Sequence, residues 1–441
     1  MHNRPSTSRG AVRSPSRSRW TRQQAGRLDR RDAFVAPVIY PPETRPNEDV
    51  HVWDTWLLRD RHGRTGDIDG WRVVFCLTAP ADVLPGKRHD VAEVRYFYSL
   101  DGRRWRDGGP VFNGGAFGQS QWAGSALVDG DDDYVYYTAA GEEGVGELTY
   151  TQRIAGAAGG RAVATDAELT LEGPWRHEVL LEPDGEYYEV EAQSRGMTST
   201  FRDPWFYEDP ATGETCLFLE GNVPVPEGSD ECDGDPDQQP FNGCVGLAVS
   251  PAGDPMEWEL RPPVLDAVCV NQELERPHVV RRDGRYYLFL SSHAHTFAPG
   301  IEGYDALYGF VANSLDGPYR PLNDTGLVVT NPAGAPFQAY SWMAFPHREA
   351  VLVQSFFNYY DFDGDTLDPV GHLPESEQLR RFGGTLAPTI RLAVDGDRTR
   401  VLGALDHWHI PTPDESLPDF LPHEPGSSLP GPAADDRGSY E

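Results

Sequence analysis

One pattern recurs five times along this chain of 441 residues: a polar or charged motif, a turn rich in Gly and Asp, and a strongly apolar, aromatic run. The motifs begin near residues 53, 122, 203, 276 and 341. Short alternating runs separated by turns indicate antiparallel strands, and a repeat of this length is typical of a four-stranded propeller blade. The sequence therefore predicts an all-β, five-bladed β-propeller with a central funnel. A β-sandwich or two smaller β domains are the alternatives.

The repeats lie between two segments of different composition. Residues 1–18 are rich in Ser, Arg and Pro and are predicted to form a disordered basic tail, and residues 411–441 are predicted to form a Pro-rich C-terminal tail. The propeller is expected to occupy residues 19–410. No apolar run reaches the roughly 18 residues that a membrane span needs, and no secretory signal is recognised in the sequence.

The charge balance is strongly acidic. Asp and Glu number 69 against 38 Lys and Arg, which gives a formal net charge of −31, and Lys87 is the single lysine. Such a surface repels the phosphates of nucleic acids and of anionic membranes, so neither is expected as a partner. Self-repulsion of this size is tolerated where molar salt shortens the screening length to about 3 Å. We interpret the chain as salt-adapted; an ordinary acidic protein is the alternative.

The five cysteines show neither the spacing of a metal site nor an even disulfide framework. Cys76, Cys216 and Cys269 lie in apolar surroundings and are interpreted as small core residues. Cys232 and Cys244 flank an Asp-rich loop and are a candidate disulfide pair. This loop lacks the Gly and the closing Glu of a calcium-binding loop, so solvated acidic side chains are expected there.

Three acidic residues stand at positions that the repeats suggest are equivalent: Asp54, Asp203 and Glu275. Glycoside cleavage requires one ionised and one protonated carboxyl group across the scissile bond. Apolar faces for sugar rings and forked donors for hydroxyl groups lie nearby in the sequence, on Trp53, Trp56, Trp122, Trp205, Arg202 and Arg276. Each motif alone also fits a turn, a buried tryptophan or a solvated ion pair. Their recurrence in register favours a shared site.

Three segments resemble the signature blocks of glycoside hydrolase family 68, the levansucrases and inulosucrases. They read HVWDTW at 51–56, FRDP at 201–204 and ELERPH at 273–278. Supporting similarity lies in WAGS at 122–125, SH at 292–293 and QAYS at 338–341. The resemblance extends over about residues 19–410 and implies the propeller fold.

The resemblance also implies an activity: cleavage of sucrose, with transfer of the fructosyl unit to sucrose, fructan or water through a covalent fructosyl-enzyme. It makes Asp54 the nucleophile, Asp203 the residue that holds fructosyl hydroxyls, and Glu275 the acid/base. It assigns substrate-binding roles to Trp53, Trp122, Arg202, Glu273, Arg276, His293 and Tyr340. In this family the position of His293 influences acceptor choice, and that of Tyr340 contacts the acid/base. An extracellular, monomeric enzyme that needs no cofactor and no metal is expected.

Two positions depart from the family pattern. Ala123 stands where a Ser usually hydrogen-bonds the nucleophile, and a water molecule or Ser125 is the candidate replacement. Gln272 stands where calcium-binding members carry Asp, so a structural calcium ion is not expected.

Two other functions remain open at this point. One is a hydrolase, either an invertase-like β-fructofuranosidase or an inverting arabinanase-type enzyme, whose carboxyl groups would lie about 6.5–9.5 Å apart. The other is a sugar-binding propeller without catalysis, which would bind its ligand after loss of Asp54.

The charge count yields a prediction about salt. Activity on sucrose and the melting temperature should both rise between low and molar NaCl, because screening relieves repulsion among the excess carboxylates. Initial rates and thermal unfolding curves measure the two responses. Flat responses would contradict the interpretation of salt adaptation.

Overall fold

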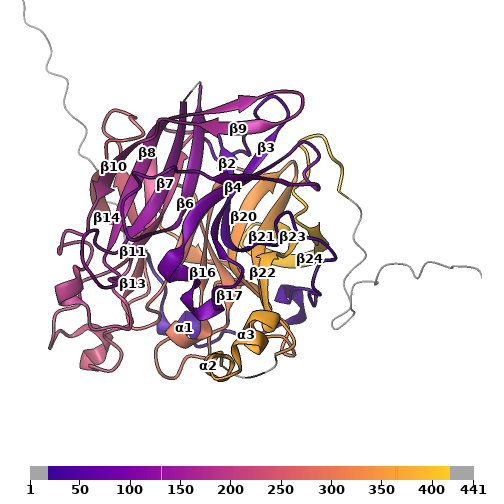
Figure 1. Ribbon diagram of the computed structural model, residues 1–441. Coiled ribbons are helices and arrows are strands. Elements are labelled where there is room, and N and C mark those ends of the chain that lie inside the picture. Colours follow the sequence, from indigo (N-terminus) through magenta and orange to yellow (C-terminus); the bar gives the residue numbers. More distant parts are fainter. Residues whose placement is uncertain (1–17, 131, 363, 365, 418–441) are drawn as a thin grey trace, which may run out of the picture.

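The computed structural model describes residues 18–130, 132–362, 364 and 366–417 (Figure 1). Of the predicted tails, 1–18 and 411–441, residues 1–17 and 418–441 lie outside the described residues. The described chain is all-β. Its α-helices are short and comprise α1 (Arg22–Ala25), α2 (Asp368–Gly371) and α3 (Glu375–Arg381). None of the helices in this part of the chain has the length and apolar character required to cross a bilayer.

The strands of the described residues follow one another as five antiparallel meanders. The first contains β2 (Val50–Arg59), β3 (Arg72–Pro80), β4 (Glu93–Ser99) and β5 (Arg106–Pro110). The second contains β6 (Ser120–Asp129), β7 (Asp132–Ala140), β8 (Gln152–Ala164) and β10 (Arg176–Leu181), with β9 (Leu169–Glu172) paired to β8. A short parallel pairing of β2 with β6 joins these two meanders into one sheet.

The remaining meanders form three separate sheets. The third contains β11 (Phe201–Glu208), β12 (Thr215–Asn222), β13 (Gly243–Val249) and β14 (Glu259–Asp266), with β1 (Ser18–Arg19) parallel to β14. The fourth contains β15 (Glu275–Arg282), β16 (Arg285–Ser292), β17 (Ala306–Ala312) and β18 (Arg320–Pro321), with β19 (Leu327–Thr330) on β17. The fifth contains β20 (Ala339–His347), β21 (Ala350–Tyr359), β23 (Pro388–Asp395) and β24 (Arg398–His407), with β22 (Phe382–Leu386) on β21.

The first strands of the meanders surround a common axis. The strand β2 contacts β6, β6 contacts β11, β11 contacts β15, β15 contacts β20, and β20 contacts β2. Each of these strands carries a register shift in its first half, which leaves Asp54, Ala123, Asp203, Arg276 and Ser341 in bulges. A bulge bends a strand and turns a side chain out of the pleat. The fold therefore places one irregular position per meander around the axis.

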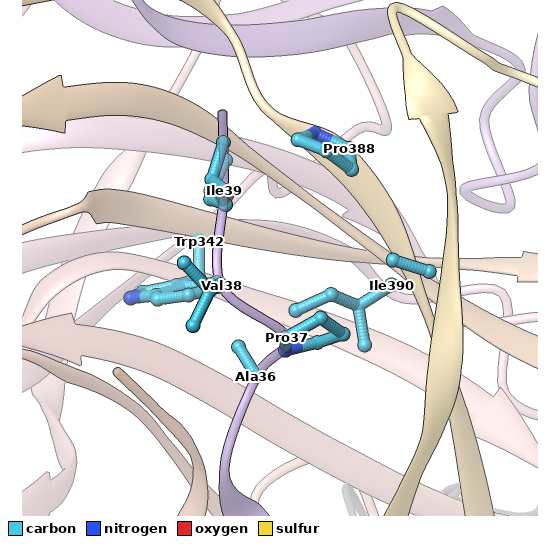
Figure 2. A pocket seen from close by; sticks show the side chains of 9 residues that line it. Ala36, Pro37, Val38, Ile39, Trp342, Pro388 and Ile390 are labelled. Atoms are coloured by element: carbon cyan, nitrogen blue, oxygen red, sulfur yellow. The ribbon is translucent and has the colours of Figure 1, made fainter. Parts of the chain in front are cut away.

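A segment in the N-terminal part of the chain, residues 36–39, packs against the fifth meander. Ala36–Ile39 runs across Trp342 and Ile390 and borders a small apolar cavity (Figure 2). Polar contacts fix it: Ile39 N donates to Gln338 Oε1 at 2.9 Å, and Gln338 Nε2 donates to Pro37 O at 2.8 Å. At the other end of the chain, residues 412–417 also pack on the body, where Glu415 Oε1 accepts from Arg103 Nη2 at 2.7 Å.

The disulfide differs from the expected pair. Cys232 bonds to Cys269, so the candidate pair Cys232–Cys244 is wrong, and so is the interpretation of Cys269 as a reduced core residue. Cys244 lies on β13 with its side chain buried in the core, whereas Cys232 lies on the loop that folds against Cys269. Cys76 and Cys216 are buried, as predicted.

The Cys232–Cys269 bond should stabilise the third meander. Replacing both cysteines with Ser should lower the free energy of unfolding by about 3–4 kcal/mol, the chain-entropy value for a loop of 37 residues. Urea unfolding of both proteins measures the difference. Reduction of the wild type should reproduce most of the loss, and equal midpoints for variant and wild type would contradict the prediction.

Candidate active site

A cavity of about 280 Å³ opens at the bulges of the first strands. Its walls come from β2, β6, β11, β15, β20, β21 and the connecting segments. The lining residues include Asp54, Arg88, His89, Asp90, Trp122, Ala123, Tyr150, Arg202, Asp203, Glu275, Arg276, His293, Tyr340, Ser341 and Phe356. The three acidic residues singled out in the sequence therefore share one cavity, although 221 positions separate the first from the last.

The three carboxyl groups do not occupy equivalent positions. Asp54 and Asp203 are bulge residues, and both have positive φ, 34° and 61°. Asp adopts this conformation more readily than most residues. Glu275 instead precedes its bulge and corresponds to Arg202, while Arg276 is the counterpart of Asp203. The interpretation of three equivalent acidic positions is thus wrong for Glu275, because the sequence alone does not show where the extra residue enters the strand.

Both carboxylate oxygens of Glu275 are held by side chains from neighbouring meanders. Arg202 Nη2 donates to Oε1 at 3.0 Å, and the Tyr340 hydroxyl donates to Oε2. Burial, together with the charge of Glu275, raises the pKa of Tyr340 well above its ordinary value. The phenol therefore stays protonated and remains a donor to Glu275.

Arg202 is the centre of a buried ionic network. Its Nε donates to Glu220 Oε2 at 2.7 Å, and its Nη2 also lies 3.4 Å from Glu273 Oε1. Burial opposes the charge on Arg202, but Glu220, Glu273 and Glu275 outweigh it and raise the pKa of the guanidinium. Glu273 is thus joined to the site through Arg202 and is not among the residues that line the cavity.

Asp203 is almost fully buried beside the other two acids. Its backbone N–H donates to Thr138 Oγ1 at 2.9 Å, and its Oδ2 accepts from Arg276 N at 3.0 Å. Burial raises the pKa of Asp203 to about 7, and the charges of Glu275 and Asp54 add to this effect against those of the arginines. A carboxyl group with this pKa changes protonation state near neutral pH.

Arg276 joins three first strands across the axis. Its Nη1 donates to Ser341 O at 3.1 Å and to Ser341 Oγ at 2.5 Å, and its Nη2 donates to Thr55 O. The residue lines the cavity, but these guanidinium donors are directed at the protein. The observed contacts favour a role in fixing the bulges of β2 and β20.

His293 stacks on Tyr340. The ring centroids lie 3.6 Å apart with an interplanar angle of 13°, and His293 Nδ1 lies 3.0 Å from Asp305 Oδ2. Burial disfavours the charged imidazole, but the Asp305 carboxylate outweighs it and raises the pKa of His293 to about 9. At neutral pH an imidazolium therefore faces the ring whose hydroxyl group holds Glu275.

A 3₁₀ segment, η2 (Pro85–Val91), supplies site residues that the sequence interpretation missed. His89 Nε2 accepts from Trp53 Nε1, and His89 O accepts from Trp122 Nε1, both at 3.1 Å. Burial lowers the pKa of His89 well below its ordinary value, which keeps the ring neutral and able to accept. Trp53 is fully buried and does not line the cavity. In the sequence, the basic cluster at residues 87–89, between two strongly apolar strand-like runs, could have indicated this part of the site.

Tyr150 and Asp90 form part of the cavity wall near the surface. Tyr150 is 52% exposed, its hydroxyl donates to Asp90 Oδ1 at 3.0 Å, and its ring lies 6.3 Å from that of Trp122. Neither Tyr150 nor Asp90 was identified from the sequence, because both lie in connecting segments rather than in the repeated motif. Together with Trp122 they give the cavity an aromatic and acidic rim.

The structure shows the side-chain contacts near the two departures from the family pattern, at Ser125 and Gln272. Ser125 is fully buried and accepts from Phe206 N at 3.1 Å, so its hydroxyl group faces β11 and does not replace the Ser absent at Ala123. Gln272 accepts from Met197 N and donates to Thr198 O, each at 3.0 Å. Both ends of the Gln272 amide are therefore bound to the backbone of residues 197–198.

Asp203→Asn should change stability in a pH-dependent way. An acid whose pKa rises from 3.8 to about 7 on folding favours the folded state at low pH, and this contribution is lost as the pH rises through 7. The variant should therefore melt at a higher temperature than the wild type at pH 8, and the two should converge toward pH 4. Thermal unfolding across this range tests it.

Asp101→Asn is a control for which we expect the opposite change in melting temperature. Hydrogen bonds from the backbone of Arg104 and Arg103 outweigh burial and lower the pKa of Asp101. Its contribution to stability is present at neutral pH, so this variant should melt below the wild type there. A difference between Asp203→Asn and wild type that is constant with pH would contradict the argument.

Comparison with known proteins identifies the family. The family model described as Levansucrase/Invertase matches residues 11–411. A levansucrase of Pseudomonas savastanoi pv. glycinea is 36% identical over 427 residues, 89% of this chain and 96% of the relative, and the extracellular sucrase of Zymomonas mobilis subsp. mobilis is 34% identical over 414 residues, 89% and 95%. The solved inulosucrase from Halalkalicoccus jeotgali bound to kestose is 61% identical, with a TM-score of 0.91 over 92% of this chain and 100% of that chain. The chain belongs to the levansucrase/invertase family.

Proposed function

We propose that the protein is a fructansucrase: it cleaves sucrose and transfers the fructosyl unit to sucrose, to a growing fructan or to water by retaining double displacement. The observation that carries this is the convergence of Asp54, Asp203 and Glu275 in one cavity, with both oxygens of Glu275 held by Arg202 and Tyr340. The names of the relatives, a levansucrase and a kestose-bound inulosucrase, agree with it.

In the first step Asp54 acts as the nucleophile. Its carboxylate attacks the anomeric carbon of the fructosyl unit as the bond to the glucosyl oxygen breaks, and Glu275 gives its proton to that oxygen. Glucose leaves, and the fructosyl unit remains covalently bound to Asp54. Arg202 and Tyr340 fix the orientation of Glu275 from two meanders, so its proton is delivered from one direction.

In the second step Glu275 acts as the base. It removes a proton from the hydroxyl group of the acceptor, whose oxygen attacks the anomeric carbon and displaces Asp54. Asp203, beside both residues in the cavity, holds fructosyl hydroxyl groups and stabilises the charge that develops on the ring. When water is the acceptor the same step is hydrolysis, which is the reaction of an invertase-like enzyme.

The remaining predicted residues support these steps. Trp122 offers the face on which the fructosyl ring packs, and Trp53 supports it from behind through His89. Glu273 acts on the substrate through Arg202, and Arg276 holds the bulges around the glucosyl side. The charged His293 and the rim at Tyr150 face the acceptor. Sugar rings bind such mixtures of aromatic faces and polar groups.

Three further properties belong to this proposal. The five meanders are five blades of a propeller, supported by the cyclic contacts of their first strands. The enzyme acts outside the cell as a monomer, a location supported by the name of the extracellular sucrase. It works in high salt, which its net charge of −31 supports.

Variants of the two reacting groups test the mechanism. Asp54→Ala should abolish release of glucose from sucrose, and Glu275→Gln should lower kcat by about 10²–10⁴-fold, the usual worth of general acid catalysis. Coupled glucose assays measure both, with circular dichroism to establish that each variant folds. Turnover close to the wild type in either one would reject the assigned roles.

A substrate with a better leaving group separates the roles. A fructoside of nitrophenol needs little protonation, so Glu275→Gln should recover nitrophenol release in the first step, whereas Asp54→Ala should not. Equal recovery in both variants would contradict the division of labour.

A further inference from the structure

One cation of the active-site cavity has no part in the steps described above. Arg88 lies on η2, outside the repeated motif, and lines the cavity together with Asp54. Its guanidinium carbon lies 5.4 Å from the centroid of the Trp53 ring, 5.8 Å from that of Phe356 and 5.2 Å from that of Phe382. Three aromatic rings thus lie around the guanidinium group, and one of them belongs to the residue before Asp54.

The protein uses only part of the hydrogen-bonding capacity of Arg88. Nη1 donates to Pro85 O at 2.6 Å, within the same 3₁₀ segment. Nε is buried and makes no hydrogen bond within the described residues. Nη2 makes none with them either, but it is not fully buried. An accessible donor on a residue of the cavity wall is therefore free to bind a ligand.

The charge of Arg88 is not compensated by a hydrogen-bonded carboxylate in the described protein. Burial lowers the pKa of Arg88, and the charges of Tyr359, Asp54 and Glu275 oppose this effect without a hydrogen bond to the guanidinium group. A charge in such surroundings costs free energy unless donors and charge find partners. An apolar side chain would pack among the three rings at a lower cost, so packing alone does not account for an arginine here.

Several other donors of the cavity wall are engaged with the protein. Both terminal nitrogens of Arg276 donate to neighbouring first strands, Arg202 Nε and Nη2 donate to glutamates, and Trp122 Nε1 donates to a backbone carbonyl. Ala123, which also lines the cavity, has no side-chain donor. Arg88 Nη2 is thus available to the hydroxyl groups of a bound sugar, which accept as well as donate hydrogen bonds.

We propose that Arg88 is a further substrate-binding residue, whose Nη2 donates to a hydroxyl group of the fructosyl unit of sucrose. This inference rests on the proposed function, in which Asp54 attacks the anomeric carbon of that unit. Arg88 packs on the ring of Trp53, next to Asp54, and is therefore assigned to the fructosyl rather than the glucosyl side. A guanidinium group suits the contact because it stays charged and its planar donors keep fixed directions.

Arg88→Met tests the contact, because methionine keeps a flexible apolar stem among the rings and removes the donor. The value of kcat/KM for sucrose should fall about ten- to a hundredfold, the usual worth of a hydrogen bond to a charged group. Initial rates of glucose release measure this change. A wild-type value in Arg88→Met would overturn the proposal.

Lys87→Met is the matched control. It removes a positive charge from the same segment, but the side chain of Lys87 is 71% exposed and the residue does not line the cavity. Its kcat/KM should stay within about twofold of the wild type, because salt screens an exposed charge. Equal losses in Lys87→Met and Arg88→Met would reduce the effect to general electrostatics and overturn the proposal.

Binding to an inactive protein separates this inference from the proposed function. In the Asp54→Ala background, the dissociation constants of sucrose and fructose should rise about ten- to a hundredfold when Arg88→Met is added, while that of glucose should not change. Calorimetric titration measures all three. An unchanged constant for fructose, or a loss confined to glucose, would overturn the assignment of Arg88. Failure of the wild type to release glucose from sucrose would instead reject the proposed function.

A purely structural role of Arg88 predicts a different pattern. Because no hydrogen-bonded carboxylate compensates its charge, Arg88→Met should melt at about the same temperature as the wild type, or above it. Thermal unfolding followed by circular dichroism measures the difference. A lower melting temperature of Arg88→Met, together with an unchanged dissociation constant for fructose, would assign the residue to the fold and overturn the proposal.

Discussion

The active site depends on the bulges of the five first strands. A regular strand alternates its side chains between two faces, and both faces of these strands are packed. The extra residue in each bulge breaks this alternation, and in four of the five strands the bulge turns a polar side chain toward the axis, whereas β6 has Ala123 there. Asp54 and Asp203 are presented in this way, and their positive φ values show that the backbone adopts the unusual conformation at these positions.

Buried charge is the cost of this arrangement, and arginine compensates for most of it. Arg202 lies among Glu220, Glu273 and Glu275, and Arg276 binds the backbone of two first strands. The planar guanidinium is suited to this task because it offers several donors in fixed directions and stays charged. The same contacts orient the acid/base, so electrostatic stabilisation and catalytic geometry come from one network.

Not every buried charge in the molecule is compensated in this way. Asp203 lies among other acids, and its raised pKa shows that the folded state holds it at an energetic disadvantage when ionised. Burial likewise lowers the pKa of the Arg59 guanidinium, which is 3% exposed. Functional groups are often kept in environments that stability alone would not favour.

The sequence by itself determined the all-β class, the repeat and the segments that carry the three acidic residues, because strand periodicity and turn residues are local properties of the chain. It did not determine which residue of each motif is the extra residue of the bulge. The interpretation of the sequence therefore treated Glu275 as equivalent to Asp54. It also left Cys232 with the wrong partner and missed His89, Asp90 and Tyr150. These features depend on which strands and loops become neighbours, and only the closed arrangement around the axis brings such distant segments together and buries their charges.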